Sequence, residues 1–109
     1  MAQRRDERVF DVSLQYRPLD PVRVRVTRRD DRVTVTDDGA AVARAGRPPG
    51  WHEVADRVSD EMVVNVSRSG AVSLPVVRVG PGEAEIVRRI AEASLALYQD
   101  LLEITDAAG

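Results

Sequence analysis

The amino-acid sequence predicts one α+β domain, with a small and mainly antiparallel sheet, two short helices and one long C-terminal helix. Residues 22–27 and residues 32–36 both alternate valine with polar side chains, which predicts the two arms of a β-hairpin. Residues 83–104 contain neither glycine nor proline and repeat apolar side chains at helical spacing, which predicts one continuous helix. At 109 residues, the chain has the usual size of a single hydrophobic core.

The segment before the hairpin divides into two parts. Residues 1–8 are polar and charged without periodicity, so we expect a disordered tail there and a single domain over residues 9–109. Apolar side chains at every second position from Phe10 to Tyr16 favour a strand, with a short helix as the alternative.

Between the hairpin and the long helix, the sequence predicts two short helices and a second hairpin. The first helix is predicted over residues 40–45, because the glycines and prolines of residues 46–50 end it. Apolar residues at helical spacing predict the second helix over residues 51–59. Residues 62–74 then predict the second hairpin, with Gly70 at its turn.

The junction Thr36-Asp37-Asp38-Gly39 connects the first hairpin to the first short helix. A carboxylate at Asp38 or Asp37 can accept hydrogen bonds from the first free amides of that helix. We assign this helix cap to Asp38, with Gly39 relaxing the turn that follows it. Under this assignment, Asp38→Ala costs about 1 kcal/mol of stability.

This junction and the order of elements around it resemble an uncharacterised bacterial family, domain of unknown function 1828. Members of that family have a Thr/Ser-Asp-Asp/Glu-Gly junction after a β-hairpin, followed later by a short hairpin and a terminal helix. The corresponding segments here are residues 36–39, 65–74 and 83–104, whereas residues 40–42 are Ala-Ala-Val in place of the leucines that the family favours. The resemblance implies a small bacterial or mobile-element protein, sometimes encoded near defence or regulatory genes, with no established activity.

Composition excludes several classes of chemistry. The chain has no cysteine, so it has no disulfide or thiolate site, which is compatible with a reducing cytoplasm, where we expect the protein. All 16 basic residues are arginine, so no lysine is present to act as a nucleophile, a Schiff base or a phosphate-loop residue. No apolar run approaches the roughly 18 residues that span a bilayer, so we expect no membrane association.

Candidate catalytic and metal-binding groups are few. His52 is the sole histidine, so one chain cannot form a site with several histidines. The aspartates at 30, 31, 37 and 38 could supply oxygen ligands for magnesium in a hydrolase, but no companion signature follows them. Capping and turn formation explain these residues adequately. We therefore expect a protein that is not an enzyme and has no cofactor and no metal.

The first 32 residues contain nine arginines and six acidic residues, and they include the best candidate for a basic surface. A stripe of arginines along a hairpin can bind the phosphates of nucleic acid. Neighbouring aspartates and a shortage of aromatic side chains argue against this function, so we hold it as the alternative. Its candidate residues are Arg17, Arg23, Arg25, Arg28, Arg29 and Arg32.

The predicted C-terminal helix has a wide apolar surface. Its apolar side chains span about 200° of arc, whereas packing on one sheet needs only about 100°. We assign one stripe to the core and expect the flank beside it to form a symmetric homodimer interface. The flank consists of Val87, Ala91, Leu95, Tyr98 and Leu102. In the alternative, the N-terminal segment or the helix around Trp51 covers this flank within one chain.

These observations favour a non-catalytic interaction or regulatory module that acts through protein–protein contacts. The wide apolar helix and the lack of a catalytic constellation are the two reasons for this hypothesis. The sequence does not identify the partner protein.

Overall fold

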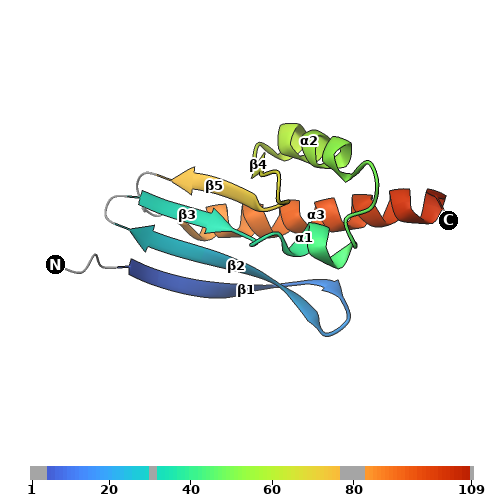
Figure 1. Ribbon diagram of the computed structural model, residues 1–109. Helices are drawn as coiled ribbons and strands as arrows, with labels where there is room; N and C mark the ends of the chain where they lie inside the picture. Colours follow the sequence, from blue (N-terminus) through green and yellow to red (C-terminus); the bar gives the residue numbers. More distant parts are fainter. Residues whose placement is uncertain (1–4, 30–31, 77–82, 109) are drawn as a thin grey trace.

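The computed structural model describes residues 5–29, 32–76 and 83–108, and it confirms the α+β fold (Figure 1). Five strands form one antiparallel sheet in the order β1-β2-β3-β5-β4. The strands are β1 (Arg5–Arg17), β2 (Asp20–Arg29), β3 (Arg32–Thr36), β4 (Asn65–Val66) and β5 (Val72–Val76). The helices are α1 (Ala40–Arg44), α2 (Trp51–Met62) and α3 (Glu83–Ala108).

Both predicted hairpins are present. Val26 of β2 lies opposite Val35 of β3, and Val66 of β4 lies opposite Val72 of β5. Residues directly opposite each other in antiparallel strands point to the same face, so the valines of β2 and β3 gather on one side of the sheet. The alternation of valine with arginine and threonine thus gives the sheet one apolar and one polar face.

The expected N-terminal tail is wrong for residues 5–8, which belong to β1, whereas residues 1–4 lie outside the described residues. Arg8 lies opposite Val26, and Glu7 lies opposite Thr27. The carboxylate of Glu7 also lies 3.2 Å from the guanidinium of Arg25. Charged side chains suit the solvent-facing positions of an edge strand, which is why the absence of an apolar pattern did not predict this part of β1.

All three helices lie apart from the polar face of the sheet. Figure 1 shows α3 running behind the sheet and on past its end, where α1 and α2 lie against it. The core fills the space between α3 and the apolar face, with Val22, Val24, Ile90 and Leu97 fully buried. We call the other side of the sheet the open face. It carries Val9 of β1 with Arg23 and Arg25 of β2, and, further along, Thr27 of β2 with Thr34 of β3.

The predicted dimer flank of the long helix is mostly covered within one chain. Val87, Ala91 and Tyr98 are buried, while Leu95 and Leu102 are only partly buried. Contacts of α3 with α1 and α2, in addition to those with the sheet, account for the part of the apolar arc that a single sheet could not cover. The expectation that all five residues form an intermolecular interface is therefore wrong for the three buried ones. Homodimerisation itself stays a prediction.

No described helix combines the length and the apolar character that crossing a bilayer requires.

Candidate functional site

The junction between β3 and α1 is built around the buried carboxylate of Asp37. The side chain is only 3% exposed, and its Oδ1 accepts hydrogen bonds from the backbone N–H groups of Gly39 and Val72, each at 2.8 Å. The backbone N–H of Asp37 in turn donates to the carbonyl of Val72, at 3.0 Å. One aspartate therefore ties the end of β3 to the start of β5 and to the turn that leads into α1.

A chain of hydroxyl groups extends from this carboxylate through the core. The hydroxyl of Ser94, on α3, donates to Oδ2 of Asp37 at 2.6 Å. Ser94 has only one hydroxyl proton, so the phenol of Tyr16, 2.6 Å from Ser94 Oγ, must donate to Ser94. The direction is therefore Tyr16 to Ser94 to Asp37. It links β1, α3 and the β3–α1 junction.

Burial changes the acidity of both ends of this chain. It raises the pKa of Tyr16 from 10.0 to about 12, which keeps the phenol protonated as a donor. Burial also raises the pKa of Asp37, although the hydrogen bonds from Ser94, Gly39 and Val72 oppose that shift. A perturbed carboxyl in a pocket is a candidate catalytic group. Here both carboxylate oxygens already have partners, and Ser94 is fully buried, so the arrangement supports a structural role.

The assignment of the helix cap to Asp38 is wrong. Gly39 is the residue that caps α1, and no side chain hydrogen-bonds to the helix from that position. Asp38 and Gly39 both have left-handed backbones, with φ of 59° and 78°, so the chain reverses and the Asp38 carboxylate turns toward Arg25, 3.0 Å away. The amide of Ala41, in the first turn of α1, is instead among the groups that hydrogen-bond to Asp37.

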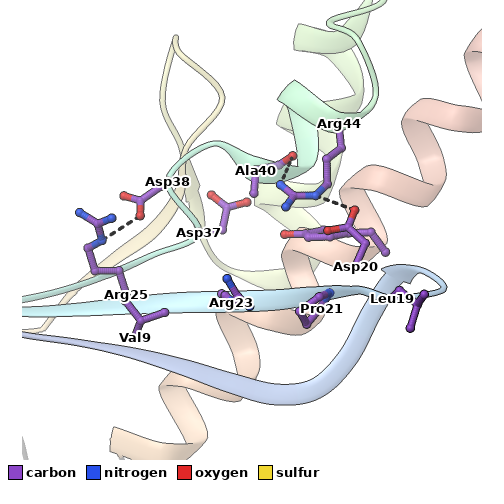
Figure 2. Close-up of a pocket in the computed structure, with 11 residues that line it drawn as sticks. Val9, Leu19, Asp20, Pro21, Arg23, Arg25, Asp37, Asp38, Ala40 and Arg44 are labelled. Atoms are coloured by element: carbon purple, nitrogen blue, oxygen red, sulfur yellow. Dashed lines mark hydrogen bonds and ion pairs between the residues drawn. The ribbon is translucent and has the colours of Figure 1, made fainter.

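A hollow of about 480 Å³ lies on the open face beside this junction (Figure 2). Val9, Arg23 and Arg25 line it from β1 and β2, and Asp38 and Ala40 line it from the β3–α1 junction. The remaining lining side chains come from the β1–β2 turn, the start of β2, α1 and the buried hydroxyl chain, and they are Tyr16, Leu19, Asp20, Pro21, Asp37 and Arg44. We call this hollow the Arg23 pocket.

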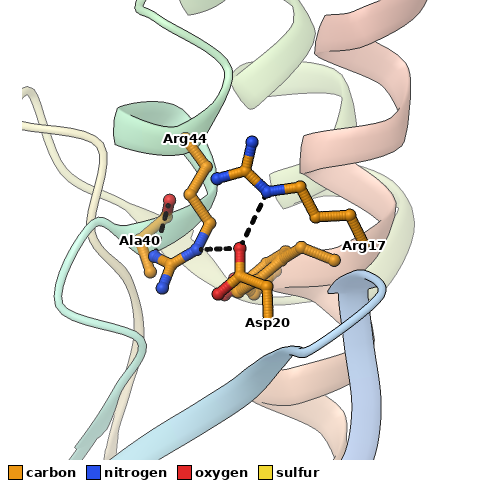
Figure 3. Close-up of polar contacts among 6 residues, drawn as sticks. Arg17, Asp20, Ala40 and Arg44 are labelled. Atoms are coloured by element: carbon orange, nitrogen blue, oxygen red, sulfur yellow. Dashed lines mark hydrogen bonds and ion pairs between the residues drawn. The ribbon is translucent and has the colours of Figure 1, made fainter.

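Ion pairs fix one end of the Arg23 pocket. Nε of Arg44 donates to Oδ2 of Asp20 at 2.9 Å, and Nε of Arg17 donates to the same oxygen at 3.1 Å (Figure 3). The Arg44 guanidinium also lies 4.7 Å from the centre of the Tyr16 ring, in a cation–π contact. The hydrogen bond from Arg44 lowers the pKa of Asp20, with a smaller effect from Arg17. This carboxylate is therefore ionised at neutral pH.

Arg23 differs from the other arginines of the pocket. Arg25 lies 3.2 Å from Glu7 and 3.0 Å from Asp38, and Arg44 is held by Asp20. Within the described part of the chain, Arg23 is solvent-exposed and has no hydrogen bond or ion pair. Its guanidinium is therefore available to a ligand.

The structure brings together only part of the predicted arginine surface. Arg23, Arg25, Arg29 and Arg32 share the open face, and Arg29 lies directly opposite Arg32. Arg28 points to the other face, where it pairs with Glu83 at 2.9 Å, and Arg17 binds Asp20 in the turn. A second hollow, of about 340 Å³, is lined by Arg29, Arg32 and two threonines.

Among the described residues, no group of three or more histidine, cysteine, aspartate or glutamate side chains could hold a metal ion. The ring of His52 stacks on that of Trp51, with ring centres 3.7 Å apart.

Two residues of the site were not predicted from the sequence: Ser94, which links Tyr16 to Asp37, and Leu19, which lines the pocket. Ser94 is the one serine of α3 and lies on its buried side, between Ala93 and Leu95, where a lone serine signals a buried hydrogen-bond partner. Leu19 follows Pro18 in the β1–β2 turn and is 94% exposed. No pattern in the sequence indicates that this leucine would avoid the core.

Comparisons of the chain with protein-family models, with curated proteins and with solved structures give no match. The resemblance to domain of unknown function 1828 stays a prediction that rests on the junction and on the order of elements.

Proposed function

We propose that the protein is a non-catalytic interaction module that binds a partner protein through the open face of its sheet. The Arg23 pocket is the observation that carries this proposal, because it combines an unengaged guanidinium with exposed aliphatic side chains. Val9 is 57% exposed and Leu19 is 94% exposed, so neither is well buried in the fold. Arginine is among the residues that are enriched at the energetically important centre of a protein–protein interface.

The bonding of the polar groups supports a role without catalysis. A catalytic site needs an accessible nucleophile or base within hydrogen-bond reach of its partner. In the described part of the chain, the hydroxyl chain of Tyr16, Ser94 and Asp37 is internally bonded and buried. The carboxylates of Asp20 and Asp38 are each held by an arginine.

An affinity pull-down from the native host tests this proposal, with a charge reversal on the open face and a matched reversal elsewhere. Arg23→Glu changes the pocket, and Arg89→Glu makes the same change at an exposed position of α3. A partner that the wild type and Arg89→Glu retain, but Arg23→Glu loses, supports binding through the open face. Circular dichroism of both variants confirms that they are folded. Partners retained equally by both variants contradict the proposal.

Nucleic-acid binding is the alternative, and the pairing of Arg29 with Arg32 favours it. The two side chains line the second hollow of the open face, where a phosphate would meet two guanidinium groups. Against it, Arg25 is already paired with two carboxylates, and the aromatic side chain that lines the hollow, Tyr16, is buried and offers no surface for base stacking.

Fluorescence anisotropy with labelled DNA and RNA at increasing salt separates the two functions. The alternative requires a log affinity that falls linearly with log salt, and a smaller slope when Arg29 and Arg32 become glutamine. Sub-micromolar binding near physiological salt would replace our proposal with the alternative.

Three further expectations accompany the proposal: a bacterial origin, a cytoplasmic location and self-association. The partly buried Leu95 and Leu102, seven residues apart on α3, are what is left of the predicted dimer flank. Sedimentation equilibrium of the wild type and of Leu102→Glu tests self-association through these two residues. A folded wild-type monomer at micromolar concentration contradicts it.

A further inference from the structure

The acidic side chains of the Arg23 pocket engage all of its arginines except one. Arg25 is held by Glu7 and Asp38, and Arg44 is held by Asp20, which Arg17 also contacts. Arg23 lines the same hollow between these pairs, without a hydrogen bond or ion pair to any described residue (Figure 2). Among the described arginines of the pocket, Arg23 is therefore the one that no carboxylate pairs with, although Nε of Arg25 also lacks a hydrogen bond.

Two exposed aliphatic side chains line the same pocket. Leu19 stands at the β1–β2 turn, and Val9 lies opposite Arg25 on the neighbouring strand. Leu19 also has a left-handed backbone, with φ of 67°, which is an unfavourable conformation for leucine. An exposed leucine in an unfavourable conformation contributes little to the stability of the fold, which makes Leu19 a candidate for contact with a ligand.

We propose that the Arg23 pocket binds a carboxylate next to an aliphatic group, as presented by an acidic side chain beside a leucine or valine in the partner protein. This inference rests on the proposed function, because it names the chemistry that the open face would recognise. A guanidinium pairs with a carboxylate through two parallel hydrogen bonds. Leu19 and Val9 would cover the neighbouring aliphatic side chain of the partner.

The charges around Arg23 favour a carboxylate over a phosphate. Asp20, Asp37 and Asp38 also line the hollow, and Asp11 lies directly opposite Arg23 on β1, so a dianion would meet carboxylates on several sides. One unengaged guanidinium balances one negative charge. One end of the pocket is already fixed, since the ion pair of Arg44 with Asp20 and the contact of Arg44 with the Tyr16 ring hold these side chains in place. A preformed site of this kind loses little conformational entropy on binding.

Three short peptides and inorganic phosphate test the proposal in NMR titrations of the labelled protein. Acetyl-Leu-Glu-Leu-amide carries an internal carboxylate, and acetyl-Leu-Gln-Leu-amide carries none. Acetyl-Leu-Gln-Leu with a free C-terminus carries only the terminal carboxylate. We expect the glutamate peptide to shift the amide signals of residues around the pocket and to bind at least about tenfold more tightly than its neutral counterpart.

The third peptide distinguishes the two sources of a carboxylate. Comparable binding by the peptide with a free C-terminus assigns the pocket to chain ends of the partner, whereas weak binding assigns it to acidic side chains. Tighter binding of phosphate than of either carboxylate peptide contradicts the proposal.

Substitutions on the open face supply the matched controls. Arg23→Gln should weaken binding of the glutamate peptide at least about tenfold. Arg32→Gln removes the same charge from the same face, but outside the pocket, and should leave the affinity unchanged. Leu19→Asn suits the left-handed backbone and keeps the fold, so a weaker affinity in this variant reports the lost aliphatic contact.

Equal affinity for the glutamate and glutamine peptides overturns the inference, as does wild-type affinity in Arg23→Gln or a lack of binding by every peptide at millimolar concentration. These failures are distinct from failure of the proposed function. A partner captured through the open face that binds Arg23→Gln as well as the wild type would uphold the function and reject the carboxylate. A host lysate without a partner would reject the function, and the peptides would still decide the chemistry of the pocket.

Discussion

The two faces of the sheet are built from the same strands, but one carries buried apolar side chains and the other carries polar side chains. On the covered face, valines from β2 and β3 pack against α3, and the polar chain from Tyr16 to Asp37 has a partner for every hydrogen. On the open face, the intervening positions hold arginine and threonine, and Arg23 has no partner among the described residues. Stability therefore depends on the covered face, and our proposal assigns binding to the open face. Substitutions on the two sides should differ accordingly.

The largest expected effect is on the covered face. Leu97→Ala removes a fully buried side chain where α3 meets the core, and it should lower the free energy of unfolding by about 2–5 kcal/mol. Thr34→Ala on the open face should change it by less than about 0.5 kcal/mol. Urea denaturation followed by circular dichroism measures both. Similar losses for the two variants would contradict the division between the faces.

The turn of the second hairpin shows how tightly the covered side is packed. A Cβ atom added at Gly70 would lie 2.8 Å from Cβ of Val42, and Gly70 has a φ of 93°. Gly70→Ala should therefore cost about 1–3 kcal/mol. Val42→Ala removes the two methyl groups at 2.9 and 3.1 Å from this position but keeps the Cβ at 2.8 Å, so the double variant should be only partly relieved, and slightly more stable than the sum of the two single losses indicates. Simple additivity in urea denaturation would show that the two methyl groups of Val42 do not contribute to the loss.

The buried hydroxyl chain should make the stability of the protein depend on pH in the alkaline range. Tyr16→Phe removes the donor to Ser94 and should cost about 0.5–1.5 kcal/mol at neutral pH. The folded state holds the phenol proton up to a pKa of about 12, whereas the unfolded chain loses it near 10.0. Wild-type stability should therefore fall between these two pH values, relative to Tyr16→Phe. Parallel pH profiles of the two proteins would contradict a buried phenol.

Asp37 should give the complementary effect at acidic pH. Its pKa is raised in the folded state, so the folded protein binds the proton more readily than the unfolded chain, and the contribution of Asp37 to stability falls as pH rises through that pKa. Asp37→Asn keeps an oxygen for the amides of Gly39 and Val72 and has no charge to bury, so it should change stability at neutral pH by less than about 1 kcal/mol.

Urea denaturation of the two proteins at increasing pH measures this effect. The wild type should lose stability relative to Asp37→Asn as pH rises from acidic to neutral. A relative gain instead would show that the hydrogen bonds to the carboxylate outweigh its desolvation.

Local patterns predicted the elements, whereas contacts between distant residues determined the site. The period of two in β2 and β3 and the uninterrupted apolar repeat of α3 are visible in the sequence, and both elements are confirmed. The choice between Asp37 and Asp38 is not visible, because it depends on the left-handed turn and on Ser94, 57 positions away from Asp37. The width of the apolar arc was interpreted as a dimer interface, since the sequence does not show that α1 and α2 return to α3.

The Arg23 pocket was beyond sequence analysis for a similar reason. Arg23 and Arg25 are two residues apart on the same face of β2 and look equivalent in the sequence, yet only Arg25 is paired with Glu7 and Asp38. The pairing depends on the register of β1 against β2 and on the direction of the β3–α1 turn. Neither is encoded by a local pattern.

The last expected effect is a small gain in stability, at the exposed Leu19. Leu97 is fully buried and Leu19 is 94% exposed, so replacement of Leu19 removes almost no buried area. Its left-handed backbone favours asparagine over leucine, so Leu19→Asn should raise the free energy of unfolding by about 0.5 kcal/mol or more. Urea denaturation measures the gain, and Leu19→Ala serves as the control, because alanine shortens the side chain without suiting the backbone. A gain in the asparagine variant alone, together with weaker peptide binding in both variants, would show that Leu19 serves binding at the expense of stability. A loss of stability in both variants would mean that Leu19 packs against the protein in solution.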